Sequence, residues 1–428
     1  MHVNGMRNIE EGRKRMLEKY AESQRILEKY SVLPGKGSDY MSTLYQITEQ
    51  NTSDVHSPKQ PLVLKRINDS VTEIYLPFKD NLALRENYIN HYGGIRLGKV
   101  LQDLDSLAGA VAYKHASNDS GELAPIIFAT AAVEHIDLKA NLSPSRNYQL
   151  TGIATYVGFS SLEVFIQLRA VPESGELTNP EPNLVASFTM VGRDKHTGKA
   201  SQLNPLLLED KDQRHLVKIS EQIKEHKKAA AEKTLLKHPP SAEDRLVIHQ
   251  LWLEASKYQN DTCRLHADLP SDMVWLDKTK MESVTVCFPS ERNVQYKIFG
   301  GHLMRLACEL SFANGSVFTH SCPSYASLDD FSFKKPVNIG SILRLTSQIV
   351  YSEPENKTFQ VAVFVDVIDN INNATERTNT FYFNFCCPSG KVRKVIPHIY
   401  EDMMKYLEGR HRAQTGKIIS KLQNAMQK

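Results

Sequence analysis

The sequence predicts an α+β fold made of two similar blocks, residues 71–195 and residues 272–390. Each block opens with a short strand-like run and continues through a polar loop, one helix-period segment and several consecutive strand-like runs. Strands and helices do not alternate along the chain, so a doubly wound parallel sheet is not expected. With 428 residues the chain is too long for one ordinary core, and about two to three domains are expected.

One long helix is expected in each block, because apolar residues recur there at helical spacing on one face. These positions are Val100, Leu101, Leu104, Leu107, Ala108 and Val111 in the first block, and Leu303, Met304, Leu306, Ala307 and Leu310 in the second. Strands are expected after each helix. The clearest is FQVAVFVDVI, in which Phe359, Val361, Val363, Val365 and Val367 alternate onto one face.

The two blocks share a register, which indicates an internal repeat. In each block an Asn precedes a Gly by eight positions, and an offset of 195 residues relates the later strands. The aligned pairs include Asn90 with Asn293, Ile95 with Ile298, Gly98 with Gly301, Leu150 with Leu345 and Tyr156 with Tyr351. In this alignment Asp105 corresponds to Cys308, which is followed by Glu309.

The blocks are flanked by charged segments with helical character, which suggests five regions along the chain. We expect a helical and polar N-terminal extension over residues 1–64, a first domain over 65–200, a helical linker over 201–270, a second domain over 271–400 and a C-terminal helix over 401–428.

Composition narrows the class of function. The net charge is +3, from 52 basic and 49 acidic residues, which argues against a nucleic-acid partner. The six cysteines form no CxxC pair, so free thiols and no metal site are expected. No apolar run approaches the roughly 20 residues of a membrane span. The N-terminus resembles neither a secretory signal nor a good transit peptide, because no apolar run follows the start and Glu10 and Glu11 come early.

The glycine pair Gly300–Gly301 opens the second predicted helix. Glycine lets a ligand approach the backbone closely, and a helix N-terminus offers free N–H groups with partial positive charge. A thioester or ester carbonyl would be polarised there. Glu291 could act as a general base and Asn293 could hold the water or the carbonyl. The alternative is structural: a tight turn at the glycines, with capping or turn roles for both polar residues.

The motifs of two other enzyme classes, phosphate-loop NTPases and Ser-His-Asp hydrolases, are incomplete or absent. The run GGIRLGKV fits a phosphate loop except that Val100 stands where Ser or Thr must bind magnesium. No G-x-S-x-G elbow is present, which argues against a Ser-His-Asp hydrolase of that type.

The run PSERNVQYKIFGGHLMRLACELS resembles the second-half signature of acyl-coenzyme A thioesterases of the double hotdog type, and the closest resemblance is to the mitochondrial acyl-coenzyme A thioesterase 9 group. IRLGKVLQDLDSLAGAVAYKH resembles the first-half signature, PSAEDRLVIHQLW the segment between the halves, and FTMVGRD the end of the first half. The resemblance covers about residues 65–410. It implies a tandem hotdog fold, in which each of two antiparallel sheets wraps around one long helix.

The resemblance also implies a composite site, in which an Asn before one helix faces an acidic residue before the other. In this sequence those positions are Asn90 and Glu291, although many relatives carry Asp at the acidic position. The mirror site would pair Asn293 with Tyr88, which is not acidic, so it is expected to be weak or inactive. The first half also carries Leu97 where the second has Gly300.

The implied reaction is hydrolysis of acyl-CoA to a fatty acid and CoA, without metal or cofactor. The carbonyl would lie near Gly98 or Gly301, with Asn90 orienting the carbonyl or the water and Glu291 activating the water. Asp105 and Glu309 are second choices for the base. The candidates for the CoA phosphates are Arg96, Lys99, Lys334 and Lys335. A homo-oligomer in the mitochondrion is expected from the resemblance. A non-catalytic acyl-CoA sensor and an enoyl-CoA hydratase remain as alternatives.

Overall fold

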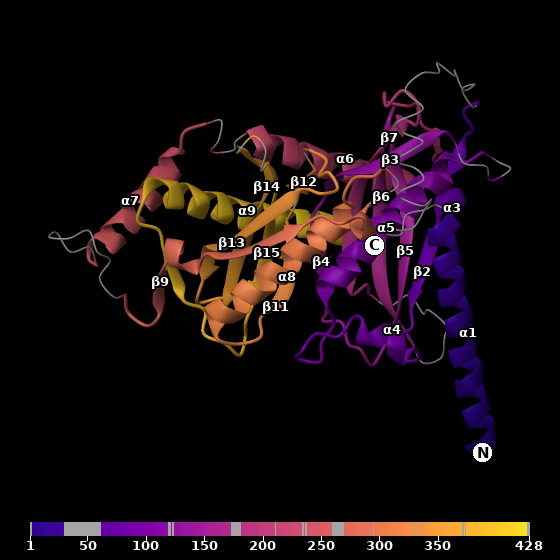
Figure 1. Cartoon of the computed structure of the whole chain (residues 1–428), viewed down its shortest axis with the longest axis horizontal. Helices are drawn as coiled ribbons and strands as arrows, with labels where there is room; N and C mark the ends of the chain where they lie inside the picture. Colours follow the sequence, from indigo (N-terminus) through magenta and orange to yellow (C-terminus); the bar gives the residue numbers. More distant parts are fainter. Residues whose placement is uncertain are drawn as a thin grey trace.

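The computed structural model shows an elongated molecule in which two halves lie end to end (Figure 1). It describes residues 2–29, 61–118, 121, 124–172, 181–209, 211–232, 235, 238–258, 269–293, 295–329, 331–333, 335–369, 372 and 374–425. Both halves combine a long buried helix with an antiparallel sheet, as the α+β prediction required. The polar residues 30–60 of the predicted extension lie outside the described residues.

The first half is a sheet that packs on one helix. Its elements are β2 (Thr72–Leu76), α4 (Leu82–Glu86), α5 (Leu97–Ala116), β3 (Ile126–Val133), β4 (Ile136–Leu138), β5 (Asn147–Val157), β6 (Ser161–Val171) and β7 (Leu184–Asp194). The strands pair antiparallel in the order β2-β5-β6-β7, and β7 then pairs with both β3 and β4.

The second half repeats this plan. It contains β10 (Met281–Val286), η2 (Pro289–Glu291), α8 (Gly300–Thr319), β11 (Ser324–Leu328), β12 (Phe331–Ser332), β13 (Ile342–Glu353), β14 (Thr358–Asp369) and β15 (Ala374–Cys386). The order β10-β13-β14-β15-β11 matches the first half strand for strand. Helices α5 and α8 both have 20 residues. The register shift before Tyr156 in β5 recurs before Tyr351 in β13, at the predicted offset.

A pseudo-two-fold relation joins the halves into one sheet. β4 of the first half pairs with β11 of the second, and β12 of the second pairs with β3 of the first. The partners are symmetric: Leu328 lies opposite Ile136, and Phe331 lies opposite Val133. Helices α5 and α8 cross antiparallel beneath this junction, where residues near the start of each helix contact the second turn of the other.

The core explains why both helices are more apolar than surface helices. In α5, Leu101, Leu104 and Leu107 have no exposed surface, because the sheet covers one face and α8 another. In β15, Phe381, Phe383 and Phe385 are likewise fully buried. Burying side chains of this size contributes about 1.5–3 kcal/mol each. The core therefore runs continuously through both halves and fixes how the two helix starts meet.

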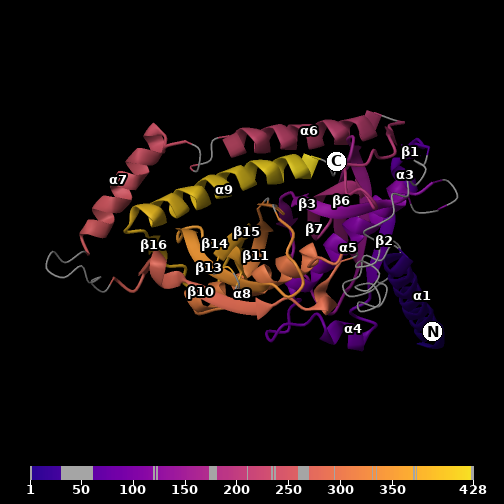
Figure 2. The ribbon, with the colours of Figure 1, turned by 45° about the horizontal axis from the view of Figure 1, so that its top comes forward.

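The remaining helices cover the outside. α1 (His2–Lys29) packs along β2, and α6 (Lys211–Glu232) runs beside α9 (Tyr400–Ala425) over the sheet, as Figure 2 shows. α7 (Ala242–Ser256) begins with a capping box in which the Ser241 hydroxyl accepts from the Asp244 N–H. The short elements are β1 (Lys65–Arg66), α3 (Ile67–Ser70), β8 (Leu206–Leu207), β9 (Met273–Trp275), η1 (Leu276–Thr279) and β16 (Lys394–Ile396).

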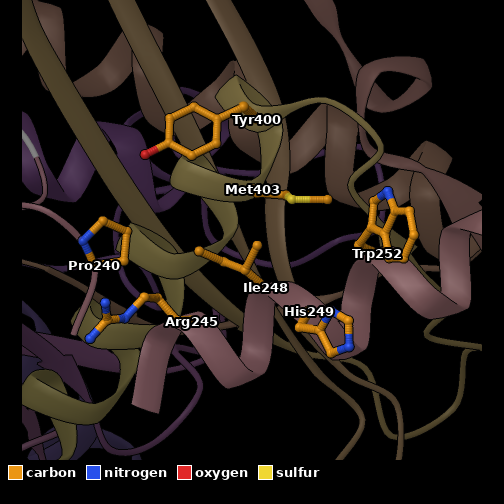
Figure 3. A pocket seen from close by; sticks show the side chains of 7 residues that line it. All are labelled: Pro240, Arg245, Ile248, His249, Trp252, Tyr400 and Met403. Carbon is orange, nitrogen blue, oxygen red and sulfur yellow. The ribbon is translucent and has the colours of Figure 1, made fainter. Parts of the chain in front are cut away.

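A hollow of about 400 Å³ lies between α7 and the start of α9. Figure 3 shows Trp252 and His249 on α7 facing Met403 and Tyr400 on α9. No predicted site residue lines this hollow.

Candidate active site at the start of α8

The loop before α8 is a small hairpin that fixes the orientation of Asn293. The Asn293 Oδ1 accepts hydrogen bonds from the backbone N–H groups of Gln295 (2.9 Å) and Lys297 (3.1 Å). Its oxygen is therefore occupied within the loop, and its NH₂ group is the part that can donate elsewhere. The Gln295 side chain donates to the Phe128 carbonyl of β3 at 3.1 Å, which fastens the loop to the first half.

Gly300 and Gly301 permit a very close approach of the two halves. A Cβ on Gly301 would lie 2.7 Å from the Phe299 ring and 3.0 Å from the Cα of Gln102 on α5. A Cβ on Gly300 would lie 3.0 Å from the Phe333 ring and 3.1 Å from the Asp105 Oδ2. The glycine pair thus has a steric function, and it brings an acidic side chain against the first turn of α8.

That acidic side chain, Asp105, comes from the third turn of α5 and is 2% exposed. Its Oδ2 accepts from the Gly301 N–H at 2.6 Å, and its Oδ1 accepts from the Thr130 hydroxyl of β3 at 2.6 Å. Burial raises the pKa of the Asp105 carboxyl to about 6, and the two hydrogen bonds limit the rise. A buried carboxyl with a pKa near neutrality at a helix N-terminus has the properties of a general base.

The mirror-related end, at the start of α5, has different chemistry. Cys308 stands where Asp105 stands in the first site, and Tyr325 stands where Thr130 stands. The Tyr325 hydroxyl donates to the Cys308 carbonyl at 2.6 Å, and the two side chains also contact each other, with the Cys308 Sγ 3.1 Å from the Tyr325 hydroxyl oxygen. Burial raises the pKa of the Cys308 thiol, so it stays protonated at neutral pH. This end offers no carboxylate at the equivalent position.

Asn90 and Glu291 occupy the predicted loop positions. The Asn90 Oδ1 accepts from the N–H groups of Tyr92 and Gly94, as Asn293 does in its own loop. A Glu291 carboxylate oxygen lies 3.6 Å from the Nδ1 of His302. Among the described residues no hydrogen bond or ion pair joins Asn90 to Glu291, so their pairing stays a prediction.

Tyr88, the residue at the position of Glu291 in the first half, donates from its hydroxyl to Asp103 at 2.7 Å. On the second half, burial lowers the pKa of the His302 imidazole, with Glu291 acting in the opposite direction.

Two of the four basic residues predicted to bind the CoA phosphates form ion pairs with carboxylates. Arg96 forms an ion pair with Glu309 at 2.5 Å, which links the start of α5 to α8. Burial lowers the pKa of the Lys99 ammonium, and the nearby Arg305 lowers it further. Lys335 is paired with Glu376 on β15. Lys334 lies outside the described residues. Arg96 and Lys335 are therefore both engaged in ion pairs, and Arg96 and Lys99 lie at the start of α5, close to α8.

Thr130 was missed by the sequence analysis. Its role depends on β3 lying beside the third turn of α5, and 25 residues of chain separate Thr130 from Asp105. The usable signal was Asp105 itself, which shares one helical face with Leu101, Leu104 and Ala108. An acidic residue on a fully apolar face must have buried partners, so such a position is a candidate site.

No group of three or more potential metal-ligating side chains occurs within the part of the chain that the structure describes. Over the same residues, none of the helices combines the length and the apolar character needed to cross a bilayer. The five cysteines described there are free thiols.

No family model matches the chain. Mitochondrial acyl-coenzyme A thioesterase 9 of Mus musculus is 32% identical over 409 residues, which cover 94% of this chain and 91% of the relative. The Homo sapiens protein of the same name is 36% identical over 348 residues, covering 81% and 77%. A solved acyl-CoA hydrolase from Staphylococcus aureus, in complex with butyryl coenzyme A, coenzyme A and coenzyme A disulfide, is 23% identical; it covers 34% of this chain and 91% of its own, with a TM-score of 0.32.

The chain belongs to the acyl-coenzyme A thioesterase family. Within that family its similarity is to the group of mitochondrial thioesterases 9 and 10.

Proposed function

We propose that this protein hydrolyses acyl-CoA to a free fatty acid and CoA at the start of α8. The observation that carries the proposal is the buried Asp105 carboxylate, held by Thr130 and by the Gly301 N–H at a glycine-led helix N-terminus. Membership of the acyl-coenzyme A thioesterase family supports the same chemistry.

In this mechanism Asp105 accepts a proton from the attacking water. The negative charge that develops on the thioester oxygen is stabilised by the Asn293 NH₂ group and by backbone N–H groups of the first turn of α8. The Gly300 N–H has no hydrogen-bond partner among the described residues, so it can donate to the substrate without breaking an existing bond. The helix dipole favours negative charge at the same place. Arg96, which pairs with Glu309, and Lys99 in the first turn of α5 are proposed to attract the CoA phosphates from across the helix crossing.

Each half is proposed to be a hotdog domain, residues 65–200 and 271–400, with the linker 201–270 and the C-terminal helix 401–428 packed outside. The matched topology and the symmetric exchange of β4 and β12 support this arrangement. The end of the molecule with Cys308 and Tyr325 is proposed to be inactive. The mitochondrial relatives support a mitochondrial location, and we expect further assembly into a homo-oligomer.

The proposal is tested by measuring thiol release from a panel of acyl-CoA substrates, from acetyl to palmitoyl, with an aromatic disulfide reagent. Thiol release with the matching free acid is the expected result. Tight binding of acyl-CoA without thiol release would instead indicate a sensor. With an enoyl-CoA added to the panel, loss of enoyl absorbance with an intact thioester would indicate a hydratase.

The pH dependence of hydrolysis should report the ionisation of Asp105. Because the working form is the carboxylate, kcat/KM is expected to rise about tenfold per pH unit below pH 6 and to level off above it. The raised pKa also means that the folded protein holds this proton more tightly than the unfolded chain does. Stability contributed by the protonated group is therefore lost as the pH rises from about 4 to about 6. A profile with no inflection near pH 6 would assign the base to another group.

A further inference from the structure

We infer that Phe333 is a specificity-determining residue that forms the wall of the acyl pocket beside the reacting carbonyl. The inference rests on the proposed function, because it places the carbonyl at the start of α8. Phe333 follows β12 and belongs to the same half as α8. Its ring lies so close to Gly300 that a Cβ there would be only 3.0 Å from the ring and 3.1 Å from the Asp105 carboxylate. The ring and the base therefore flank the same backbone position.

The mirror-related end has a small apolar cavity beside the start of its helix. The cavity, of about 10 Å³, is lined by residues of both halves, among them Leu97, Leu138 and Tyr325. Applying the helix and strand offsets of the repeat, the corresponding residues at the α8 end are Gly300, Phe333 and Thr130. Thr130 holds Asp105, so the corresponding space adjoins the proposed base.

The start of α5 and the start of α8 differ in how side-chain volume is divided between the helix and the strand. At the mirror end a leucine on the helix and a leucine at the end of β4, Leu97 and Leu138, line the same cavity. At the α8 end glycine replaces the first leucine and phenylalanine replaces the second. The glycine provides the room that the Phe333 ring takes. This exchange keeps the helix start accessible at the backbone while an aromatic wall limits the space beside it.

The Phe333 ring is supported from behind and cannot move away freely. Its backbone N–H donates to the Ala131 carbonyl of β3 at 2.9 Å. Its ring packs at a right angle on Phe331, with centroids 5.4 Å apart, and Phe331 in turn packs on Phe381 at 4.5 Å. Phe331 is 7% exposed, so the support belongs to the core. A wall fixed in this way restricts the bulk of the acyl group.

The test compares octanoyl-CoA with acetyl-CoA for wild type, Phe333→Leu and Phe333→Ala. The expected result is a rise of about tenfold or more in the octanoyl-to-acetyl ratio of kcat/KM, since each methylene accommodated in an apolar pocket changes discrimination by roughly tenfold or more. Leu138→Ala is the matched control, because it removes the corresponding side chain at the mirror end, and its ratio should equal that of wild type. Phe333→Leu keeps an apolar side chain in place if the alanine variant fails to fold.

Binding of the two corresponding S-alkyl-CoA thioethers is measured in parallel, since these analogues cannot be hydrolysed. An unchanged ratio in folded Phe333 variants, by turnover and by binding, overturns the inference. A shift produced equally by Leu138→Ala also overturns it. Absence of thiol release by wild type would refute the proposed function, while a ratio of thioether affinities that changes only in the Phe333 variants would still support the acyl wall.

Discussion

Replacing Asp105 with asparagine is expected to lower kcat for acyl-CoA hydrolysis by about a hundredfold to ten-thousandfold, the usual contribution of a general base. Asparagine can keep both hydrogen bonds, because its oxygen can accept from the Gly301 N–H and its NH₂ can donate to the rotated Thr130 hydroxyl. The loss of kcat should therefore come from the missing general base and not from a disturbed structure. Initial rates of thiol release measure it, and KM should change much less than kcat.

The matched control for this variant is Cys308→Ser, which makes an isosteric change at the mirror position. Its rate should stay within about twofold of wild type. The melting temperature of Asp105→Asn should not fall, because the variant removes a buried charge whose ionisation is unfavourable. Wild-type turnover by Asp105→Asn would show that another residue is the base, with Glu291 and Glu309 the next carboxylates to replace.

Replacing Gly301 with alanine is expected to destabilise the protein by about 1–3 kcal/mol, as overpacking of a core usually does. The new methyl group would lie 3.0 Å from the Cα of Gln102, and backbone cannot rotate away as a side chain can. Helix α8 must then shift from α5, which also disturbs the bond between Asp105 and the Gly301 N–H. Thermal or denaturant unfolding measures the first effect, and kcat measures the second.

Gly98→Ala provides the comparison at the mirror crossing. Its methyl group would lie 3.1 Å from the Arg305 Cγ and 3.2 Å from the Arg305 carbonyl, so a smaller loss of stability is expected. Because Cys308 stands at that end where Asp105 stands beside α8, kcat should be largely retained. If Gly301→Ala had the stability and activity of wild type, the close approach at α8 would not be required.

Local pattern was sufficient to predict the long helices and the strand offsets. The spacing of Leu101, Leu104 and Leu107 follows from a helix buried on one side, and the matched Tyr156 and Tyr351 fall at equivalent irregularities in two strands. These features depend on neighbours only a few residues away or on direct comparison of the two blocks.

The composition of the site was harder to predict, because it depends on contacts between distant segments. Asp105 and Gly301 are 196 positions apart and meet only because α5 and α8 cross beneath the joined sheet. Glu291 was the first choice because it precedes the glycines in sequence, whereas the carboxylate in contact with them comes from the other half. Thr130 could be placed only once the pairing of β3 with β7 had set its position beside α5.

If hydrolysis takes place at only one of the two pseudo-symmetric ends, the two loop asparagines must differ in their effect on turnover. Asn293→Ala and Asn90→Ala remove equivalent amides that make equivalent loop hydrogen bonds. Their kcat/KM values for thiol release from the best acyl-CoA should therefore be compared side by side with wild type. We expect a loss of about a hundredfold for Asn293→Ala, as for other donors to a developing oxyanion, and little change for Asn90→Ala. A large loss for Asn90→Ala with an active Asn293→Ala would contradict this expectation and would favour the site formed by Asn90 and Glu291.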